Sequence, residues 1–255
     1  MNAVISLAGH RTLITGGSRG IGRAAAILFA EAGSDVAFNY VRDEKAADEV
    51  KEAVESRGRL CLARKADLAR RDEAAALAGA VADAWGGVDI LVNNHGIWTY
   101  LEMGDGDVDS WKKTMAVNLD GVFYLTDAVV PLMKARNKGC IINVGSTAGI
   151  RGEAHHSHYA ATKGALNALT KSWSSELAPF GIRVNCVAPG WVDTDMSAES
   201  FAVPAFRESI RQSIPLKRIP PPEDIAGPIL FLASNLARHI TGAIINVNGG
   251  AVLCG

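Results

Sequence analysis

The sequence predicts a doubly wound α/β fold, in which a parallel sheet is covered by helices on both faces. Short runs rich in Val, Ile and Leu, bounded by Gly, Asn or Asp, alternate with longer stretches of helical period. Several of the short runs are apolar on both faces, which is typical of buried parallel strands. Because strand and helix alternate regularly, right-handed crossovers between parallel strands are expected.

Seven strands and six main helices are predicted in this order. The strands are expected at Arg11–Thr15, Asp35–Tyr40, Arg59–Lys65, Val88–Asn93, Cys140–Gly145, Arg183–Ala188 and Ala243–Val247. The helices are expected at Ile21–Ala32, Asp43–Arg57, Asp72–Trp85, near Asp109–Lys138, at Tyr159–Pro179 and at Glu223–Ala233. These elements predict a seven-stranded parallel sheet with helices on both faces.

Length and composition are those of an ordinary globular protein. The chain has 255 residues, of which 48% are hydrophobic and 21% charged, so intrinsic disorder is not expected. No linker, repeat or low-complexity tract interrupts the alternation, and alternating α/β chains reach this length as one domain. We therefore expect a single domain over residues 1–255.

Charge and cysteine usage narrow the setting in which the protein works. Twenty-six basic against 27 acidic side chains give no electrostatic reason for binding nucleic acid or an anionic membrane. No uninterrupted apolar stretch reaches roughly 18 residues, and the N-terminus does not resemble a signal peptide. The cysteines form no CxxC pair and are expected to be buried thiols in a reducing compartment: Cys61, Cys140, Cys186 and Cys254. We expect a soluble, cytoplasmic protein.

One segment, residues 193–222, breaks the alternation. It carries apolar residues without a strand partner and is closed by Pro215, Pro220, Pro221 and Pro222. A long insertion at the carboxyl edge of a parallel sheet is where a substrate lid would lie. A surface helix pair or a subunit contact is the alternative.

A glycine cluster follows the first strand, and a helix opens there. It reads Thr15-Gly16-Gly17-Ser18-Arg19-Gly20-Ile21-Gly22. Glycines let the backbone turn tightly and approach a pyrophosphate, whose charge is favoured by the N-terminus of the following helix. The position of the cluster, between the first strand and an Ala-rich amphipathic helix, predicts dinucleotide binding.

Three further side chains predict proton-transfer chemistry. Tyr159 and Lys163 stand four residues apart in a helical stretch and therefore share one face. A tyrosine proton donor needs its pKa brought from about 10 toward 7, about 4 kcal/mol, and a nearby ammonium supplies part of that shift. Ser146, on the loop after a central strand, would donate a hydrogen bond to the substrate oxygen. Taken alone, the Tyr-x-x-x-Lys spacing also fits a surface tyrosine.

These motifs together resemble the classical short-chain dehydrogenase/reductase family, and within it most the 3-oxoacyl-(acyl-carrier-protein) reductase branch. The resemblance runs from about Leu7 to the C-terminus. Its elements are the G-x-x-x-G-x-G spacing of the glycine cluster, Asn93-Asn94-His95-Gly96 in place of N-N-A-G, Asn118, Ser146, Tyr159 to Lys163 as Y-x-x-x-K, Pro189-Gly190 and Gly242–Gly250.

The resemblance implies a Rossmann fold and a Ser-Tyr-Lys-Asn tetrad that works without a metal. The tetrad would be Asn118, Ser146, Tyr159 and Lys163; Lys163 would also bind the nicotinamide ribose, and Asn118 would complete a proton relay through water. Without the resemblance, Asn118 is only a polar residue in an apolar helix, more typical of a backbone hydrogen-bonder. The expected substrate contacts are Ser146, His156, Tyr159 and Trp191.

The end of the second strand favours NADP(H) over NAD(H). An acidic residue there would hold the adenosine 2′-hydroxyl and repel a 2′-phosphate, but no acid appears before Asp43. Arg19 and Arg42 would both lie near such a phosphate, unless they are only solvated surface charges. The expected cofactor contacts are Gly16, Ser18, Arg19, Gly20, Ile21, Gly22, Asn39, Tyr40, Arg42, Asp67, Leu68, Asn94, Gly96, Tyr159, Lys163, Pro189, Gly190, Val192 and Thr194. Among them, Asp67 resembles the family residue that meets the adenine ring.

Two features depart from the family pattern. His95 replaces an alanine, and we interpret it as a loop histidine pointing away from the cofactor, with crowding of the cofactor as the alternative. His155, His156 and His158 precede Tyr159 directly, but neighbouring residues in an irregular loop seldom converge on a metal. His156 would contact substrate if it lines the pocket, and a solvated histidine loop is the alternative.

The leading functional prediction is an NADPH-dependent reductase that converts a carbonyl, in a 3-oxoacyl thioester or another ketone, to a secondary alcohol, or the reverse. The alternatives are an NAD-dependent alcohol or sugar dehydrogenase, an epimerase or dehydratase of the same family, and a non-catalytic dinucleotide sensor. An acyl-carrier-protein substrate would need a basic patch at the pocket mouth, for which the candidates are Lys134, Arg136, Lys138 and Lys171. Aromatic and apolar residues in the expected pocket loops favour an apolar or aromatic substrate: Trp98, Tyr100, Met103, Trp191 and Phe201.

A homotetramer with twofold interfaces is expected, since classical members of the family are usually tetramers. The stretch Trp111–Met133 is apolar on more than one face, although a helix on one side of a sheet should keep its outer face polar. The tail Ile244–Cys254 is almost uncharged, although an edge strand is normally guarded by charge. Extra loops of the same chain covering both surfaces are the alternative.

Overall fold

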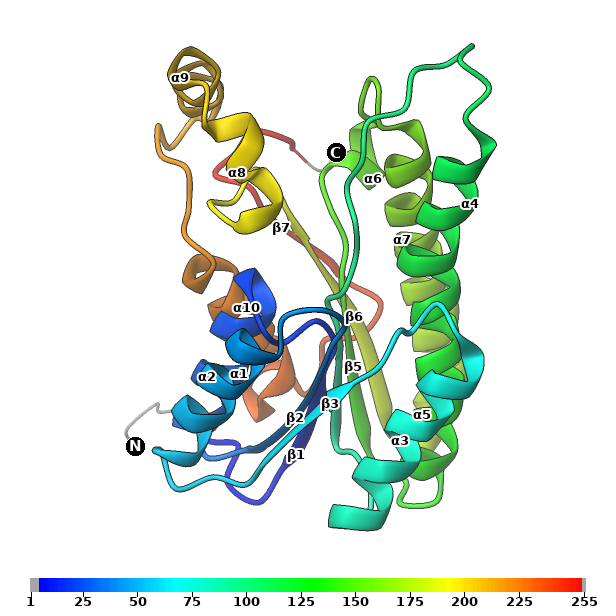
Figure 1. The fold of residues 1–255 in the computed structure, drawn as a ribbon. Helices are drawn as coiled ribbons and strands as arrows, with labels where there is room; N and C mark the ends of the chain where they lie inside the picture. Colours follow the sequence, from blue (N-terminus) through cyan, green and yellow to red (C-terminus); the bar gives the residue numbers. More distant parts are fainter. Residues whose placement is uncertain (1–4, 254–255) are drawn as a thin grey trace.

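The computed structural model describes residues 5–253, so Cys254 lies outside the described residues. Seven strands form one parallel sheet in the order β3-β2-β1-β4-β5-β6-β7 (Figure 1). The strands are β1 (Arg11–Ile14), β2 (Asp35–Tyr40), β3 (Cys61–Lys65), β4 (Ile90–Asn93), β5 (Gly139–Val144), β6 (Ile182–Pro189) and β7 (Ile244–Val247). The predicted seven-stranded, doubly wound Rossmann fold is confirmed, and the strand order reverses between β1 and β4.

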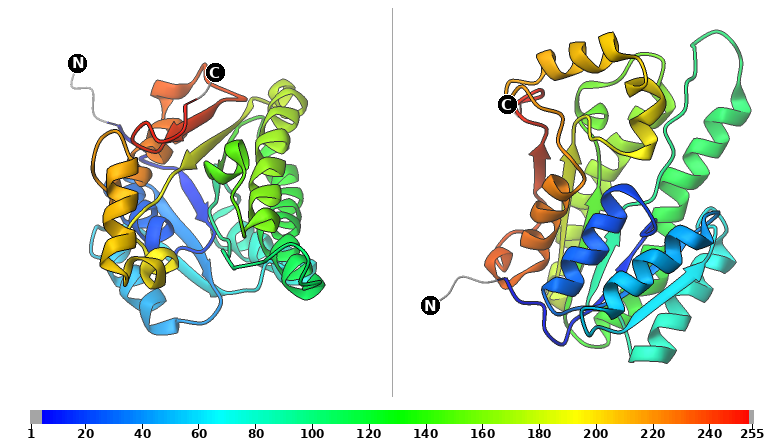
Figure 2. Two further views of the ribbon diagram at one scale, coloured as in Figure 1. Left: turned by 90° about the horizontal axis from the view of Figure 1, so that it is seen from above. Right: turned by 60° about the vertical axis from the view of Figure 1, so that its left-hand side comes forward.

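Helices cover both faces of this sheet, as Figure 2 shows in the view from above. One face carries α1 (Gly20–Glu31), α2 (Glu44–Glu55) and α10 (Glu223–Ala233). The other carries α3 (Arg71–Trp85), α4 (Val108–Met115), α5 (Gly121–Lys134) and α7 (Ser157–Leu177). Short 3₁₀ turns follow α7 at Ala178–Phe180 and α10 at Asn235–Ala237.

The core consists of two apolar layers, one on each side of the sheet. Phe29 of α1 and Phe38 of β2 are fully buried in the first layer, and Leu91 of β4 and Met133 of α5 in the second. Every residue of β4 and β5 is buried, which explains why these strands are apolar on both faces. Burying one such side chain contributes about 1.5–3 kcal/mol, so the centre of the sheet is a rigid base for the loops at its edge.

The single long helix predicted near Asp109–Lys138 is divided in the structure. A π-helical turn, Ala116–Asp120, separates α4 from α5. A π-turn inserts a residue into the helix and rotates the following side chains, and such turns occur frequently at functional sites. Hydrophobic periodicity does not reveal this break, because the apolar pattern continues on both sides of it.

The run Val108–Lys134 is long and apolar enough, by length and composition alone, to cross a membrane. Charged and polar residues divide this run, so no uninterrupted apolar stretch within it reaches roughly 18 residues. One such helix is weak evidence for a membrane span, because the core helix of a soluble protein meets the same criterion. In the fold, α5 packs against α3, and α4 packs against α7.

Residues 193–222 form a helix pair, α8 (Asp195–Phe201) and α9 (Pro204–Ser213), at the carboxyl end of the sheet (Figure 1). An ion pair of 2.6 Å joins Asp193 to Arg207 of α9. The helix pair is the arrangement that the sequence analysis held as the alternative, and a role as a substrate lid stays a prediction. A short helix that the sequence analysis did not predict, α6 (Ala148–Arg151), follows β5.

Candidate active site

A cavity of about 460 Å³ opens at the carboxyl edge of the sheet, beside the point where the strand order reverses. In doubly wound folds this is the usual place for a ligand. Its lining brings together most of the predicted site residues: Gly16, Ser18, Arg19, Gly20, Ile21, Asn39, Tyr40, Arg42, Asp67, Leu68, Asn94, Gly96, Ser146, Tyr159, Lys163, Pro189, Gly190, Trp191, Val192 and Thr194. Three predicted residues do not line it, namely Gly22, Asn118 and His156.

The glycine cluster forms a tight loop between β1 and α1. Gly16 has a φ of +63°, in the region that favours glycine, and its N–H donates to Asn39 Oδ1 at 2.9 Å. A side chain at Gly22 would overlap the carbonyl oxygen of Gly16 and would lie 2.6 Å from Asn94 Nδ2. The loop therefore requires glycine for its own geometry, and its backbone is exposed to the cavity.

The N-terminus of α1 has the features of an anion-binding site. The N-cap residue, Arg19, makes no side-chain cap, and the first turn contains no acidic residue. The first N–H groups of a helix have no partner within the helix, and the helix dipole is positive at this end. Because Gly20 and Ile21 line the cavity, these features fit a pyrophosphate, and the site therefore fits a dinucleotide.

Asn39 fastens the glycine loop and also lines the cavity. Its side chain is buried, accepts the Gly16 N–H and donates through Nδ2 to Ala66 O at 2.9 Å. Both ends of the amide are therefore used by the backbone of the glycine loop and of the segment after β3, and its role as a cofactor contact stays a prediction. Arg19 and Arg42 are exposed on the cavity lining, and neither forms an ion pair with a described residue.

The predicted catalytic pair lies on one face of α7. Lys163 Nζ lies 5.7 Å from the centroid of the Tyr159 ring and donates to Val144 O, at the end of β5, at 2.8 Å. Only 9% of Tyr159 and 4% of Lys163 is exposed. Burial lowers the pKa of Lys163 to about 8, so the ammonium remains the main form at pH 7.

Burial also controls Tyr159, in the direction opposite to the sequence expectation. It raises the pKa of the Tyr159 hydroxyl to about 12; a hydrogen bond with Ser146 lowers it in part, and the negative charge of Glu153 raises it further. Lys163, expected to lower this pKa, donates its hydrogen bond to Val144 O. In the chain alone, Tyr159 is therefore a protonated phenol at neutral pH, as a proton donor must be.

Asn118 lies in the π-helical turn and is completely buried. Its Oδ1 accepts from the Ile97 N–H and its Nδ2 donates to Ile97 O, both at 2.8 Å. This pair of bonds fastens the loop that follows β4 to the break in the helix. The side chain is thus a backbone hydrogen-bonder, as its residue type suggested, and the proton relay stays a prediction.

The His95 ring lies inside the protein rather than in solvent. Its Nδ1 lies 2.7 Å from Thr15 Oγ1, at the start of the glycine loop. Burial lowers its pKa to about 4, so the ring is neutral at pH 7. The histidine supports the glycine loop and also lines the cavity, so whether it crowds the cofactor stays a prediction.

The three histidines before Tyr159 each meet a different residue of the loop after β4. His156 stacks on Trp98 at 4.1 Å between ring centroids, His155 stacks on Tyr100 at 5.2 Å, and His158 Nε2 lies 2.9 Å from Thr99 Oγ1. Their rings are directed to separate partners, not to a common metal. His156 stacks on Trp98 and is not among the residues that line the cavity, so a contact with the substrate stays a prediction.

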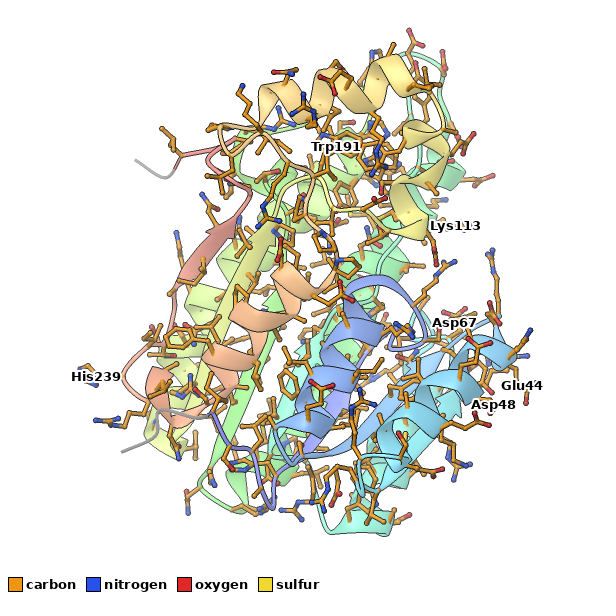
Figure 3. All side chains as sticks on the ribbon, turned by 90° about the vertical axis from the view of Figure 1, so that its left-hand side faces the viewer. Glu44, Asp48, Asp67, Lys113, Trp191 and His239 are labelled. Atoms are coloured by element: carbon orange, nitrogen blue, oxygen red, sulfur yellow. The ribbon has the colours of Figure 1, made fainter. Side chains whose placement is uncertain are left out.

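Several residues that line the cavity were not among the predicted site residues, including Lys113, Arg151, Glu153 and Met196. The position of Arg151 and Glu153 between Ser146 and Tyr159 could have identified them, whereas Lys113 and Met196 reach the cavity only through the packing of α4 and α8. Figure 3 shows Lys113 and Trp191 near the α8–α9 pair, Asp67 close to Glu44 and Asp48 of α2, and His239 at the opposite end of the molecule.

The proposed basic patch does not lie at the cavity mouth. Lys134 ends α5, and Arg136 and Lys138 lie between α5 and β5, so all three lie at the amino edge of the sheet, opposite the cavity. Arg136 pairs with Asp89 at 2.7 Å, and Lys134 Nζ lies 4.4 Å from the centroid of the Phe180 ring. Lys171 is twelve residues beyond Tyr159 on α7, about 18 Å along the helix.

Comparison with known proteins decides the family. The family model described as Enoyl-(Acyl carrier protein) reductase matches residues 16–252. A 3-oxoacyl-[acyl-carrier-protein] reductase of Synechocystis is 39% identical over 249 residues, which are 97% of this chain and 99% of that protein. The chain belongs to the short-chain dehydrogenase/reductase family. Members of this family are oxidoreductases that bind a nicotinamide dinucleotide.

Other relatives within the short-chain dehydrogenase/reductase family have different names. An L-rhamnose 1-dehydrogenase (NAD(P)(+)) of Sphingomonas is 37% identical over 245 residues, 96% of each chain. A solved structure from Beutenbergia cavernae is provisionally assigned as an NAD(P)-dependent gluconate 5-dehydrogenase with bound NADP at low occupancy. It has a TM-score of 0.92 and 35% identity, and the match covers 98% of this chain and 99% of that chain.

Proposed function

We propose that this protein is an NADP(H)-dependent oxidoreductase that interconverts a carbonyl group and a secondary alcohol without a bound metal. One observation carries the proposal: the buried Tyr159 hydroxyl, hydrogen-bonded to Ser146, lines the same cavity as the uncapped N-terminus of α1. A proton donor and a pyrophosphate site thus share one enclosure.

The chain's own residues would hold the cofactor and manage the proton. The glycine loop and the first turn of α1 would bind the pyrophosphate, and Lys163 would bind the nicotinamide ribose. The bound nicotinamide supplies or accepts the hydride. Tyr159 gives its proton to the substrate oxygen during reduction and takes one from the alcohol during oxidation, while the Ser146 hydroxyl stabilises the charge on that oxygen.

Two exposed arginines support NADP(H) as the cofactor. Arg19 and Arg42 line the cavity, and neither has an ion-pair partner among the described residues. No acid precedes Asp43 at the end of β2 to repel a 2′-phosphate. The NADP in the Beutenbergia structure agrees with this choice, and the rhamnose dehydrogenase name, which includes both cofactors, keeps NAD(H) as the alternative.

The relatives suggest two substrate classes, 3-oxoacyl thioesters carried on acyl carrier protein and sugars. For this chain we propose a small-molecule substrate with a carbonyl or alcohol group.

We also propose that residues 1–255 form a single domain in which residues 193–222 act as a lid over the substrate. The protein would work in the cytoplasm as a homotetramer.

The replacement Tyr159→Phe tests the proposal because it removes only the proton donor. We expect NADPH binding, measured by fluorescence titration, to be retained, and turnover of any accepted ketone, followed by NADPH absorbance, to be almost abolished. Turnover within about threefold of the wild type would contradict the role of Tyr159, since general acid catalysis contributes about 10²–10⁴-fold.

A further inference from the structure

Two indole rings, Trp98 and Trp191, line the cavity, and three further aromatic rings pack against them outside its lining. Trp98 and His156 are parallel within 1°, and Trp191 meets Trp98 edge to face at 5.6 Å. The centroid of the Trp191 ring lies 5.4 Å from that of Phe201 in α8 and 5.6 Å from that of Phe206 in α9. We call these five residues, Trp98, His156, Trp191, Phe201 and Phe206, the aromatic wall.

The topology shows that the aromatic wall crosses the mouth of the site. Trp98 follows β4 and Trp191 follows β6, and these strands are separated by β5, whose loop carries Ser146. Neighbouring strands lie about 4.8 Å apart, so the two indoles bridge roughly 10 Å across the end of β5. A long, flexible acyl chain would have to displace this contact, whereas a compact ring fits against it.

The aromatic wall is held firmly in place. One face of Trp98 is covered by His156, and the loop carrying Trp98 is tied to the loop before α7 by the Leu101 N–H, which donates to His155 O at 2.7 Å. Aromatic pairs of this geometry contribute about 0.5–1.5 kcal/mol each beyond the area they bury. Trp98 also lines the cavity, so it presents a rigid aromatic surface to a ligand.

A carboxylate without a partner lines the same cavity. Glu153 makes no side-chain hydrogen bond or ion pair within residues 5–253, and it lines the same cavity as Ser146 and Tyr159. A ligand that covers a carboxylate must offer hydrogen-bond donors, because an unpaired charge is costly to desolvate. A 3-oxoacyl chain or an unsubstituted ring offers none, whereas a hydroxylated ring offers several.

From these contacts we infer that the substrate is a compact, hydroxylated ring, such as a pyranose or a cyclic polyol, with its C–H face against Trp98 and a hydroxyl group on Glu153. Trp98 and Glu153 are then the residues that select the substrate, with His156 as a positioning residue behind Trp98. This inference rests on the proposed function and specifies its substrate class. An acyl group on a carrier protein is disfavoured by the same wall, because a long chain would have to displace the contact between Trp98 and Trp191.

Oxidation of three kinds of alcohol with NADP+ and with NAD+ tests the inference. The probes are a panel of pyranoses that includes L-rhamnose and D-glucose, cyclohexanol as a ring with a single hydroxyl, and 3-hydroxybutyryl-coenzyme A as a chain thioester. We expect the best pyranose to exceed both other probes in kcat/KM by at least tenfold. If the thioester or cyclohexanol is the best substrate and its turnover requires Tyr159, the inference fails and the proposed function stands.

Variants of Trp98 and Glu153 test whether these two residues select the substrate, and each has a matched control. Trp98→Ala should raise KM for the pyranose at least tenfold with a smaller change in kcat, and Trp98→Phe should recover most of the loss. Glu153→Gln should lower kcat/KM for the pyranose more than kcat/KM for cyclohexanol. The control Glu102→Gln should behave as the wild type, because the Glu102 carboxylate accepts from the Tyr100 hydroxyl outside the cavity. Unchanged pyranose kinetics in Trp98→Ala and Glu153→Gln would overturn the inference.

Binding without turnover separates the remaining outcomes. Titration of the protein with the pyranoses should change its tryptophan fluorescence, and Trp98→Phe should lose most of that change. If no alcohol or ketone is turned over with either cofactor, the proposed function fails; the fluorescence change then still supports the pocket assignment, and its absence overturns it.

Discussion

At Tyr159, burial determines which form of the phenol predominates. Burial is the largest influence on this hydroxyl and raises its pKa to about 12. The neutral phenol is the form that reduction requires. Oxidation requires the phenolate, so the two directions should depend differently on pH.

We therefore expect kcat/KM for alcohol oxidation to rise with pH by roughly tenfold per unit, until it levels at the pKa of Tyr159 in the complex. Reduction should be nearly flat through neutral pH, because the donor is already protonated there. Initial rates across a pH series in both directions check this, and the residual rate of Tyr159→Phe should lack the slope. A flat oxidation profile would remove Tyr159 as the base.

Arg19 and Arg42 make the cofactor prediction testable. The double replacement Arg19→Ala with Arg42→Ala should weaken NADPH binding by about 10- to 100-fold, because hydrogen bonds to charged groups contribute about 1.5–3 kcal/mol. NADH binding should stay nearly unchanged. Titrations with both cofactors check this, with the exposed Arg238→Ala as the control. Equal losses for the two cofactors would show that these arginines do not recognise the 2′-phosphate.

Among the secondary-structure elements, the π-helical break between α4 and α5 positions the loop after β4. Asn118 uses the π-helical turn to reach both polar groups of Ile97, and so fixes the loop that carries Asn94, Gly96 and Trp98. A continuous α-helix would direct this amide elsewhere. The helix prediction was right about the element and wrong about its continuity, because a one-residue insertion leaves almost no trace in an apolar pattern.

Asn118→Ala should lower the free energy of unfolding by about 2 kcal/mol, because it leaves the Ile97 N–H and C=O without their partner. It should also reduce kcat, since the loop beside the substrate loses its support. Denaturant unfolding and steady-state kinetics check the two effects. Asn235→Ala, in the 3₁₀ turn after α10, is the matched control. Unchanged stability in Asn118→Ala would mean that the two hydrogen bonds are dispensable.

At the scale of the whole molecule, apolar surface remains on the outer helices and on the last edge of the sheet. Phe123 of α5 is 48% exposed, and β7 forms one edge of the sheet and is only partly buried. Loops of the same chain therefore leave part of these surfaces uncovered. A second copy of the chain is the partner that the sequence analysis predicted for both.

Light scattering at micromolar concentration should give a mass close to four chains. Phe123→Asp should shift the protein toward smaller species, because it places a charge in a desolvated contact, whereas Leu60→Asp, on the loop before β3, should not. A stable, active monomer of the wild type would contradict the homotetramer.

The parallel sheet, its helices and the glycine loop between β1 and α1 could all be predicted from the amino-acid sequence. Each depends on local order: the alternation of short apolar runs and helical stretches, a glycine cluster between a strand and a helix, and a four-residue spacing that places Tyr159 and Lys163 on one face of α7. These signals are short-range, so they can be recognised without knowing what packs against them.

The surroundings of the glycine loop, Tyr159 and Lys163 depend on how distant segments of the chain pack together. Trp98, His156 and Trp191 are far apart in the chain and meet because their loops leave one edge of the sheet. Asn39 is turned inward to the glycine loop, and the basic residues after α5 lie at the opposite edge. Burial, which raises the pKa of Tyr159 and lowers that of Lys163, arises only when distant segments pack together, and no local pattern in the sequence encodes it.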